Sequence, residues 1–223
     1  MATDVVSLWN LAVSAAGGRG SISAEDENSR EANLCRLWYE PVRDNVLKSA
    51  SWPCTKKYES LAVLATRADF NATWTNTDPA PGWAYAYGVP NDMLAPRYLT
   101  TYAPFERALY GDVNSIVTNQ PLAVLHYTMK QTDVTRWDAG LDAAVRYTLA
   151  ANLSMPLSGK STRTRELRDL AFNTVREART DMANESDQFS DAAPVWIGER
   201  GYSGPTSPTR FFYPYENLNA VAT

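Results

Sequence analysis

The chain has 223 residues, of which 44% are hydrophobic and 21% are charged, and its formal net charge at pH 7 is −4. This length is enough for one domain, or for one domain with a sizeable insertion. The acidic balance argues against nucleic-acid binding through a basic surface, and no stretch has the ~20 apolar residues that a membrane span requires. Cys35 and Cys54 are too few for a disulfide scaffold, which indicates free thiols in a reducing compartment.

Two helices are predicted in the first part of the chain. The first follows a cap at Thr3 or Asp4 and ends at Gly17-Gly18, because glycine is the usual residue at a helix C-terminus. The second, residues 29–50, carries the strongest helical signal in the chain. Its predicted core face follows spacings of three and four residues and consists of Cys35, Trp38, Val42 and Val46. The short connection predicts antiparallel packing of the two helices.

A β-rich insertion is predicted at residues 55–134. Gly111-Asp112 stands between two apolar runs and is a good signal for a two-residue hairpin. Large and small residues alternate from Trp83 to Tyr87 with the period of a strand. Asparagine and proline residues indicate a loop at residues 67–82. The expected strands belong to one small antiparallel sheet and cover residues 83–87, 105–110, 113–118 and 122–129, with a weaker extended signal at residues 55–66.

Helical spacing returns at Arg136 and predicts two further helices. The first ends at Pro156 and Gly159, and the second begins at a Ser161 cap. Their predicted core faces are Leu141, Ala144, Val145, Leu149 and Leu153 in the first helix, and Leu167, Leu170, Ala171, Val175, Ala178 and Met182 in the second. Two antiparallel helix pairs of this kind suggest a bundle.

The predicted fold class is therefore α+β and mainly α: an antiparallel helical bundle with an inserted small antiparallel β-sheet and an extended C-terminal arm. Residues 1–54 form the first half of the bundle, 55–134 the β-rich insertion, 135–186 the second half and 187–223 the arm. A free linker is seldom as aromatic as this arm, so we expect it to order against a neighbouring protein. Its candidate partner-binding residues are Trp196, Tyr202, Phe211, Phe212, Tyr213 and Tyr215.

Two motifs resemble parts of known chemical sites. Gly159-Lys160-Ser161 matches part of a phosphate-binding loop, but Ser154 stands where that loop needs glycine, and a helix precedes it, so a turn is predicted. His126 is the only histidine and lies mid-strand, without the GxSxG elbow of a Ser-His-Asp hydrolase. One histidine and two separated cysteines do not make a zinc set. No catalytic residue, metal or cofactor is therefore expected, and the chain is predicted not to be an enzyme.

An ordered series of short motifs carries a family resemblance. The series includes Leu8-Trp9-Asn10-Leu11-Ala12, Cys35-Arg36-Leu37-Trp38-Tyr39, Trp52-Pro53, Gly82-Trp83-Ala84-Tyr85-Ala86-Tyr87, Ile116-Val117-Thr118-Asn119 and Leu149-Ala150-Ala151-Asn152-Leu153. In this order the motifs resemble the tail tubular protein A family of bacteriophages, the head-to-tail adaptors of short-tailed phages, over residues 4–185. The aromatic arm after Asp187 has no counterpart among these motifs.

The resemblance implies a structural protein of the virion tail, synthesised in the host cytoplasm. A ring of twelve copies would stand between the portal protein and the tail nozzle protein, with DNA passing through the lumen without sequence-specific binding and with no membrane contact. The arm would then anchor on the portal or on an adjacent subunit. The alternative is a small helical regulatory or protein-binding module without ring assembly, and a hydrolase that uses His126 ranks far below both.

Overall fold

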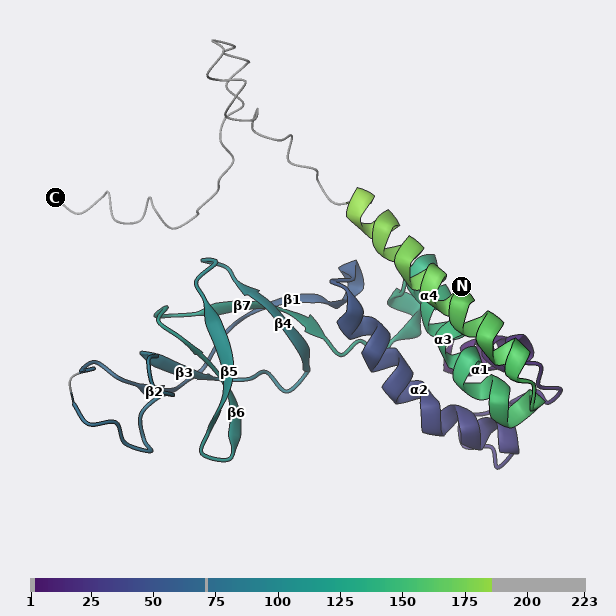
Figure 1. The fold of residues 1–223 in the computed structure, drawn as a ribbon, viewed down its shortest axis with the longest axis horizontal. Helices are drawn as coiled ribbons and strands as arrows, with labels where there is room; N and C mark the ends of the chain where they lie inside the picture. The colour runs from purple at the N-terminus through teal and green to yellow at the C-terminus, as the bar shows by residue number, and fades with distance from the viewer. Residues whose placement is uncertain (1–2, 71, 186–223) are drawn as a thin grey trace, which may run out of the picture. The chain divides into compact units, whose positions relative to one another are not determined.

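The computed structural model describes residues 3–70 and 72–185, which form a mixed α+β fold with two small antiparallel sheets (Figure 1). The elements in chain order are α1 (Val5–Ala16), α2 (Arg30–Ser49), η1 (Pro53–Thr55), β1 (Lys56–Ser60), β2 (Val63–Thr66), β3 (Tyr85–Gly88), β4 (Met93–Leu99), β5 (Phe105–Tyr110), β6 (Val113–Thr118), β7 (Val124–Met129), η2 (Val134–Arg136), α3 (Ala139–Ser158) and α4 (Ser161–Glu185). The predicted arm, residues 187–223, lies outside the described residues.

The predicted helix ends are confirmed closely because they depend on local signals. The Asp4 side chain accepts a hydrogen bond from the Ser7 amide at 2.6 Å and caps α1, while Gly17 ends it with a left-handed φ of 89°. Ser29 caps α2 in the same way. The helix expected from Arg136 begins instead at Ala139, because Asp138 accepts a hydrogen bond from the Leu141 amide and sets its start.

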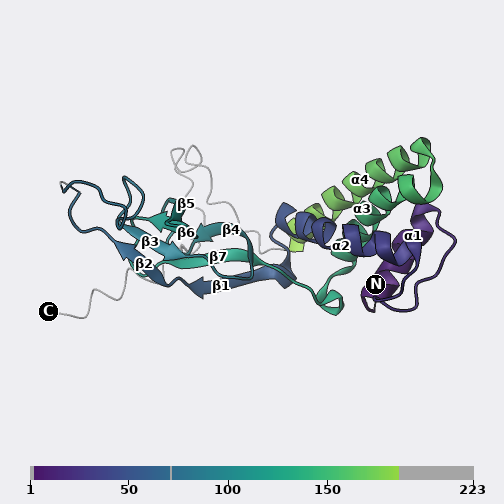
Figure 2. The same ribbon diagram turned by 90° about the horizontal axis from the view of Figure 1, so that it is seen from below.

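The four described helices share one hydrophobic core. α1 and α2 each pack mainly against α3, rather than chiefly against one another as predicted. The hydroxyl groups of Ser154 and Thr164 lie 2.7 Å apart, and a Cβ at Gly140 would lie 2.9 Å from the Ala178 Cβ. These contacts make α3 and α4 closely packed and antiparallel, as they also run in both views (Figure 1, Figure 2).

Two residues assigned to predicted core faces lie outside the core. Trp38 is 39% exposed, and Tyr39 occupies the buried position between Cys35 and Val42. Successive residues of a helix point about 100° apart. Trp38 and Tyr39 lie three and four residues after Cys35, so the spacing alone is compatible with either of them in the core. Leu170 of α4 is also exposed, whereas Leu167 and Ala171 beside it are buried.

The single predicted sheet is wrong, because the strands form two sheets. Their strand orders are β1-β7-β4 and β2-β3-β6-β5. The hairpin of β5 and β6 is confirmed with its turn at Gly111-Asp112, but β7 pairs with β1 and β4 instead of joining that hairpin. Strand β4 was not predicted, since Pro96 lies within it and its pairing contains two register shifts.

A second hydrophobic cluster belongs to the strands and is separate from the helical core. It contains Leu61, Tyr87, Leu99, Ile116, Ala123, Leu125 and Tyr127. Across the described ranges, none of the helices has both the length and the apolar composition needed to span a bilayer. Cys35 and Cys54 are free, as predicted, and burial raises the pKa of the Cys35 thiol to about 12, which keeps it unreactive.

Candidate interaction surfaces

The partner-binding residues predicted in the arm all lie outside the described residues. They are Trp196, Tyr202, Phe211, Phe212, Tyr213 and Tyr215. The surfaces below belong to the helices and strands that the structure describes.

One apolar surface runs along α2 beside its core face, and its first residue, Leu34, packs partly against the helical core. Leu37 and Trp38 follow Leu34 by three and four residues, and Pro41 follows Trp38 and Leu37 by three and four, which aligns the four residues along the helix. Leu37 is 64% exposed, and Leu34 is half-buried. We call these four residues the α2 ridge. A helix with a second apolar stripe of this spacing is typical of a helix that also packs against a partner.

The α2 ridge could have been found from the sequence. The same three-and-four spacing that marks the core face also runs through Leu34, Leu37 and Pro41. The prediction assigned Trp38 to the core face and gave this helix one apolar face instead of two.

A second apolar surface is a groove between α3 and α4, with a volume of about 280 Å³. We call it the α3–α4 groove, and its lining residues are Thr148, Ala151, Asn152, Arg168, Ala171, Phe172 and Val175. Phe172, one of the lining residues, is 68% exposed, and Met155 on α3 is also exposed. Exposed apolar side chains gathered beside a concave surface indicate a site for another protein.

Aromatic rings line the outer face of the β1-β7-β4 sheet. His126 on β7 lies between Tyr58 and Tyr98, with ring centroids 4.5 Å away on both sides. Tyr102 stacks on Tyr98 at 5.2 Å and has a left-handed φ of 56°, which is uncommon for a residue other than glycine. The sheet-face position predicted for His126 is therefore confirmed, in a row of four rings in which Tyr58 stacks on His126, Tyr98 is tilted against it by 47° and Tyr102 stacks on Tyr98.

The imidazole of His126 is buried and neutral. Burial lowers its pKa, and the positive charges of Lys56 and Arg97 lower it further. Both ring nitrogens lack a hydrogen-bond partner within the described ranges. A general base needs a second group that orients it, and no described side chain plays that part here.

Acidification is expected to destabilise the fold through His126. Because folding lowers the pKa of this side chain below its ordinary value of 6.5, the unfolded chain binds a proton first as the pH falls. The contribution of the neutral His126 side chain to stability is therefore complete above pH 6.5 and is lost as the pH falls below 6.5 and through the lowered pKa of the folded chain. We expect the urea midpoint of the chain to fall between about pH 7.5 and about pH 5.5, and to fall less in the His126→Phe variant, which keeps the stacked ring.

His126 is the only histidine, so few other side chains titrate in this range and the comparison is clean. An equal pH dependence in the wild-type chain and in His126→Phe would contradict the assignment.

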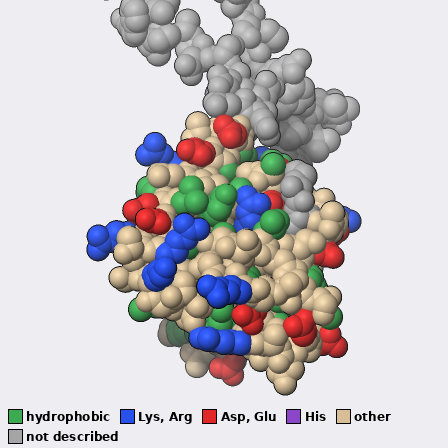
Figure 3. Space-filling view, turned by 90° about the vertical axis from the view of Figure 1, so that its right-hand side faces the viewer, with side chains coloured by type: hydrophobic (Ala, Val, Ile, Leu, Met, Phe, Trp, Pro, Cys, Tyr) green, Lys and Arg blue, Asp and Glu red, His purple; other side chains and the backbone are tan. Residues whose placement is uncertain are grey.

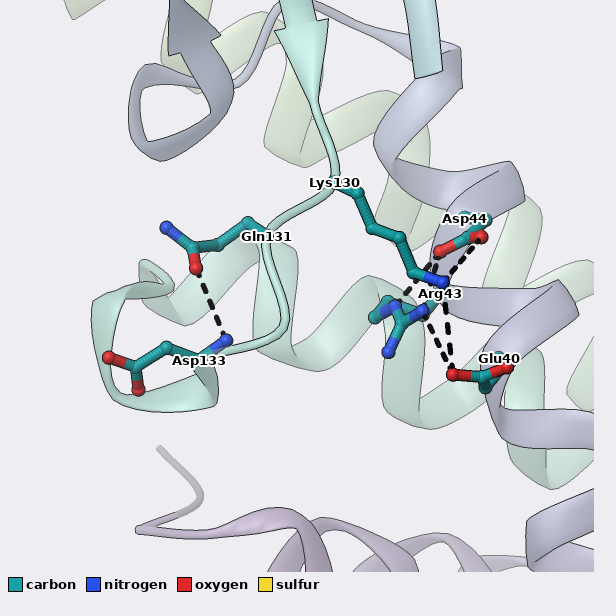
Figure 4. A network of polar contacts seen from close by, with 6 residues as sticks. All are labelled: Glu40, Arg43, Asp44, Lys130, Gln131 and Asp133. Carbon is teal, nitrogen blue, oxygen red and sulfur yellow. Dashed lines mark hydrogen bonds and ion pairs between the residues drawn. The ribbon is translucent and has the colours of Figure 1, made fainter. Parts of the chain in front are cut away.

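Charged residues join α2 to the segment that follows β7 (Figure 4). The Arg43 guanidinium is almost fully buried, and its Nε donates to Asp44 Oδ1 at 2.9 Å. Its Nη2 lies 3.5 Å from Glu40 Oε1, and Lys130 Nζ lies within 4 Å of both acids, at 3.8 Å and 3.9 Å. Two cations and two carboxylates thus hold this segment against α2.

Arg97 makes a second polar connection, from β4 to the end of α2. Its Nη2 donates to the carbonyl oxygens of Lys48 at 3.0 Å and Ala50 at 2.5 Å. Its Nε donates to Thr128 Oγ1 on β7 at 2.7 Å. A cation at a helix C-terminus satisfies carbonyl groups that have no partner in the helix. Arg97 therefore connects the strands to α2 by polar contacts, and Leu94 of β4 adds an apolar contact with the helical core.

No group of three or more His, Cys, Asp or Glu side chains in the described part of the chain is arranged to hold a metal ion. Comparison with protein-family models and with curated proteins finds no match for this chain.

Proposed function

We propose that the chain is the subunit of a head-to-tail adaptor ring in a bacteriophage virion. The observation that carries the proposal is the presence of two unlike apolar surfaces on different helices, the α2 ridge and the α3–α4 groove. A closed ring is built from heterologous contacts, in which each subunit uses two different patches. The motif series between residues 4 and 185 supports the same assignment by resemblance.

The ring contact in this proposal inserts the α2 ridge of one subunit into the α3–α4 groove of the next. A row of apolar side chains on one helix fits a groove between two others, as in other helix-in-groove contacts. Leu37 and Trp38 would contact Phe172 and the groove beside it. The four helices would act as an antiparallel bundle that forms the ring wall, and the strands would face a neighbour or the nozzle protein.

The portal protein and the tail nozzle protein are the proposed partners above and below a ring of about twelve copies. The net charge of −4 suits a lumen through which DNA slides without being held. Trp196, Tyr202, Phe211, Phe212, Tyr213 and Tyr215 are proposed to anchor the arm on the portal or on an adjacent subunit.

The mass of the purified chain, alone and after mixing with portal complex from the same phage, tests the proposal. A small species that becomes a large ring on the portal supports the adaptor and a templated assembly. A species that stays small and ignores the portal contradicts the adaptor. That result would favour the alternative, a small helical protein-binding module that uses the same α3–α4 groove for one partner.

Deletion of residues 187–223 is expected to abolish attachment to the portal, because the aromatic anchors are lost. The helices and strands are expected to fold as before, since the removed residues lie outside α4 (Ser161–Glu185). Portal co-sedimentation measures attachment, and the circular dichroism melting curve of the shortened chain controls for folding. Attachment that persists in the shortened chain would remove the arm from the proposal.

A further inference from the structure

Four helix ends surround a hollow of about 560 Å³ whose charged lining is mostly basic. The end of α1, the start of α2, the end of α3 and the start of α4 contribute its walls. We call it the basic hollow, after Arg19, Arg30, Lys160 and Arg163. Lysine and arginine side chains gather on the face of the molecule shown in Figure 3.

Two of these arginines are held in place by helix ends. Arg163 donates from Nε and Nη2 to the Ala15 carbonyl oxygen at 3.2 Å and 2.8 Å, in the last turn of α1. Arg30 donates from Nη2 to the Pro156 carbonyl oxygen at 2.5 Å, in the last turn of α3. Each guanidinium thus donates to a carbonyl group in the last turn of another helix, where carbonyl groups have no partner within that helix. The remaining N–H groups of Arg30 have no partner among the described residues and are available for a ligand, whereas Arg163 Nη1 also lies 3.7 Å from Glu166 Oε2.

The positive charge of the basic hollow is only partly compensated. Within the described ranges Arg19, Arg30 and Lys160 form no ion pair, and Arg163 lies 3.7 Å from Glu166. Glu31 is the one acidic residue among those that line the hollow. A concave surface lined mainly by one sign of charge concentrates the electric field and attracts ions of the opposite sign.

We propose that the basic hollow binds a phosphate group. The guanidinium groups of arginine can each donate two hydrogen bonds to phosphate oxygens, and the ammonium group of lysine adds a compact positive charge. Together they match the several oxygens and the negative charge of a phosphate group. Lys160 belongs to the Gly159-Lys160-Ser161 fragment, which here follows a helix and opens another, so it contributes without a Walker loop.

The proposal stands independently of the adaptor assignment, because it involves neither the α2 ridge nor the α3–α4 groove. The phosphate group can come from free inorganic phosphate or from the backbone of DNA. Both sources present the same phosphate oxygens to the hollow, so the experiment includes a separate titration for each source.

Calorimetric titration of the full chain with inorganic phosphate, in a buffer without phosphate, tests the proposal. Lys160→Gln and Arg19→Gln are each expected to weaken binding about tenfold, because each removes one charge-assisted contact. Neither side chain has a hydrogen-bond partner in the described part of the chain, so both variants should fold. Matched controls are Lys56→Gln and Arg107→Gln, whose exposed side chains lie on β1 and β5 and should leave binding unchanged.

The second titration uses a short DNA duplex in place of inorganic phosphate. Duplex binding that weakens in the same two variants identifies DNA as the source, and phosphate binding without duplex binding identifies free phosphate. Absence of binding in both titrations overturns the proposal. Binding that is unchanged in Lys160→Gln and Arg19→Gln, or equally weakened in the controls, overturns it as well.

Discussion

Replacement of Phe172 by aspartate is expected to abolish ring assembly while the subunit stays folded. Phe172 is 68% exposed, so its removal costs the isolated subunit little. In the proposed ring the same position is buried against the α2 ridge of the next subunit, where a carboxylate would lose its hydration without a partner. We expect subunit association to weaken about 100-fold or more, measured by sedimentation of the chain mixed with portal complex.

Leu109→Asp is the matched control for this variant. Leu109 is also an exposed apolar residue, at 69%, but it lies on β5, away from the α2 ridge and the α3–α4 groove. Ring assembly should therefore survive the Leu109 change, and Leu37→Asp on the α2 ridge should reproduce the Phe172 defect. Normal assembly of both Phe172→Asp and Leu37→Asp would exclude the proposed contact.

Trp52→Ala is expected to produce the largest loss of stability. The Trp52 side chain is fully buried in the helical core, and its Nε1–H donates to the Val46 carbonyl oxygen at 2.9 Å. Truncation removes that hydrogen bond and leaves a large cavity, so the free energy of unfolding should fall by about 3–5 kcal/mol. The corresponding decrease in melting temperature is about 10 °C for a domain of this size.

Trp74→Ala provides the comparison for Trp52→Ala. Trp74 also donates from its indole nitrogen to a carbonyl oxygen, that of Pro79 at 2.8 Å, but its ring is exposed. Its loss should cost no more than about 1 kcal/mol, which is the typical contribution of one hydrogen bond. Equal losses of stability in the two variants would show that burial of Trp52 is not what stabilises the helical core.

Features that depend on neighbouring residues could be predicted from the sequence. Asp4 and Ser29 cap their helices, Gly17 and Gly159 end theirs, and the Gly111-Asp112 hairpin has the predicted turn. Each of these requires only the conformational preference of one residue and the pattern beside it. The core faces of α2 and α3 were recovered for the same reason, apart from the exchange of Trp38 for Tyr39.

Features that depend on pairing between distant residues could not be predicted. Strand β7 was expected beside the β5–β6 hairpin because the two are adjacent in sequence, yet its partners are β1 and β4. A strand pattern shows which face is buried but does not identify the partner strand. The basic hollow escaped notice because Arg19 and Arg30 are far from Lys160 in sequence, and only the helix ends bring them together.

The insertion of the strands between α2 and α3 has a consequence for synthesis of the chain. α1 and α2 pack mainly against α3, and roughly 90 residues lie between the end of α2 and the start of α3. At translation rates of roughly 5–20 residues per second, the apolar faces of α1 and α2 leave the ribosome several seconds before their partner helix exists. The nascent chain therefore exposes the apolar faces of two helices during this interval, and chaperones have time to bind them before the helical core closes.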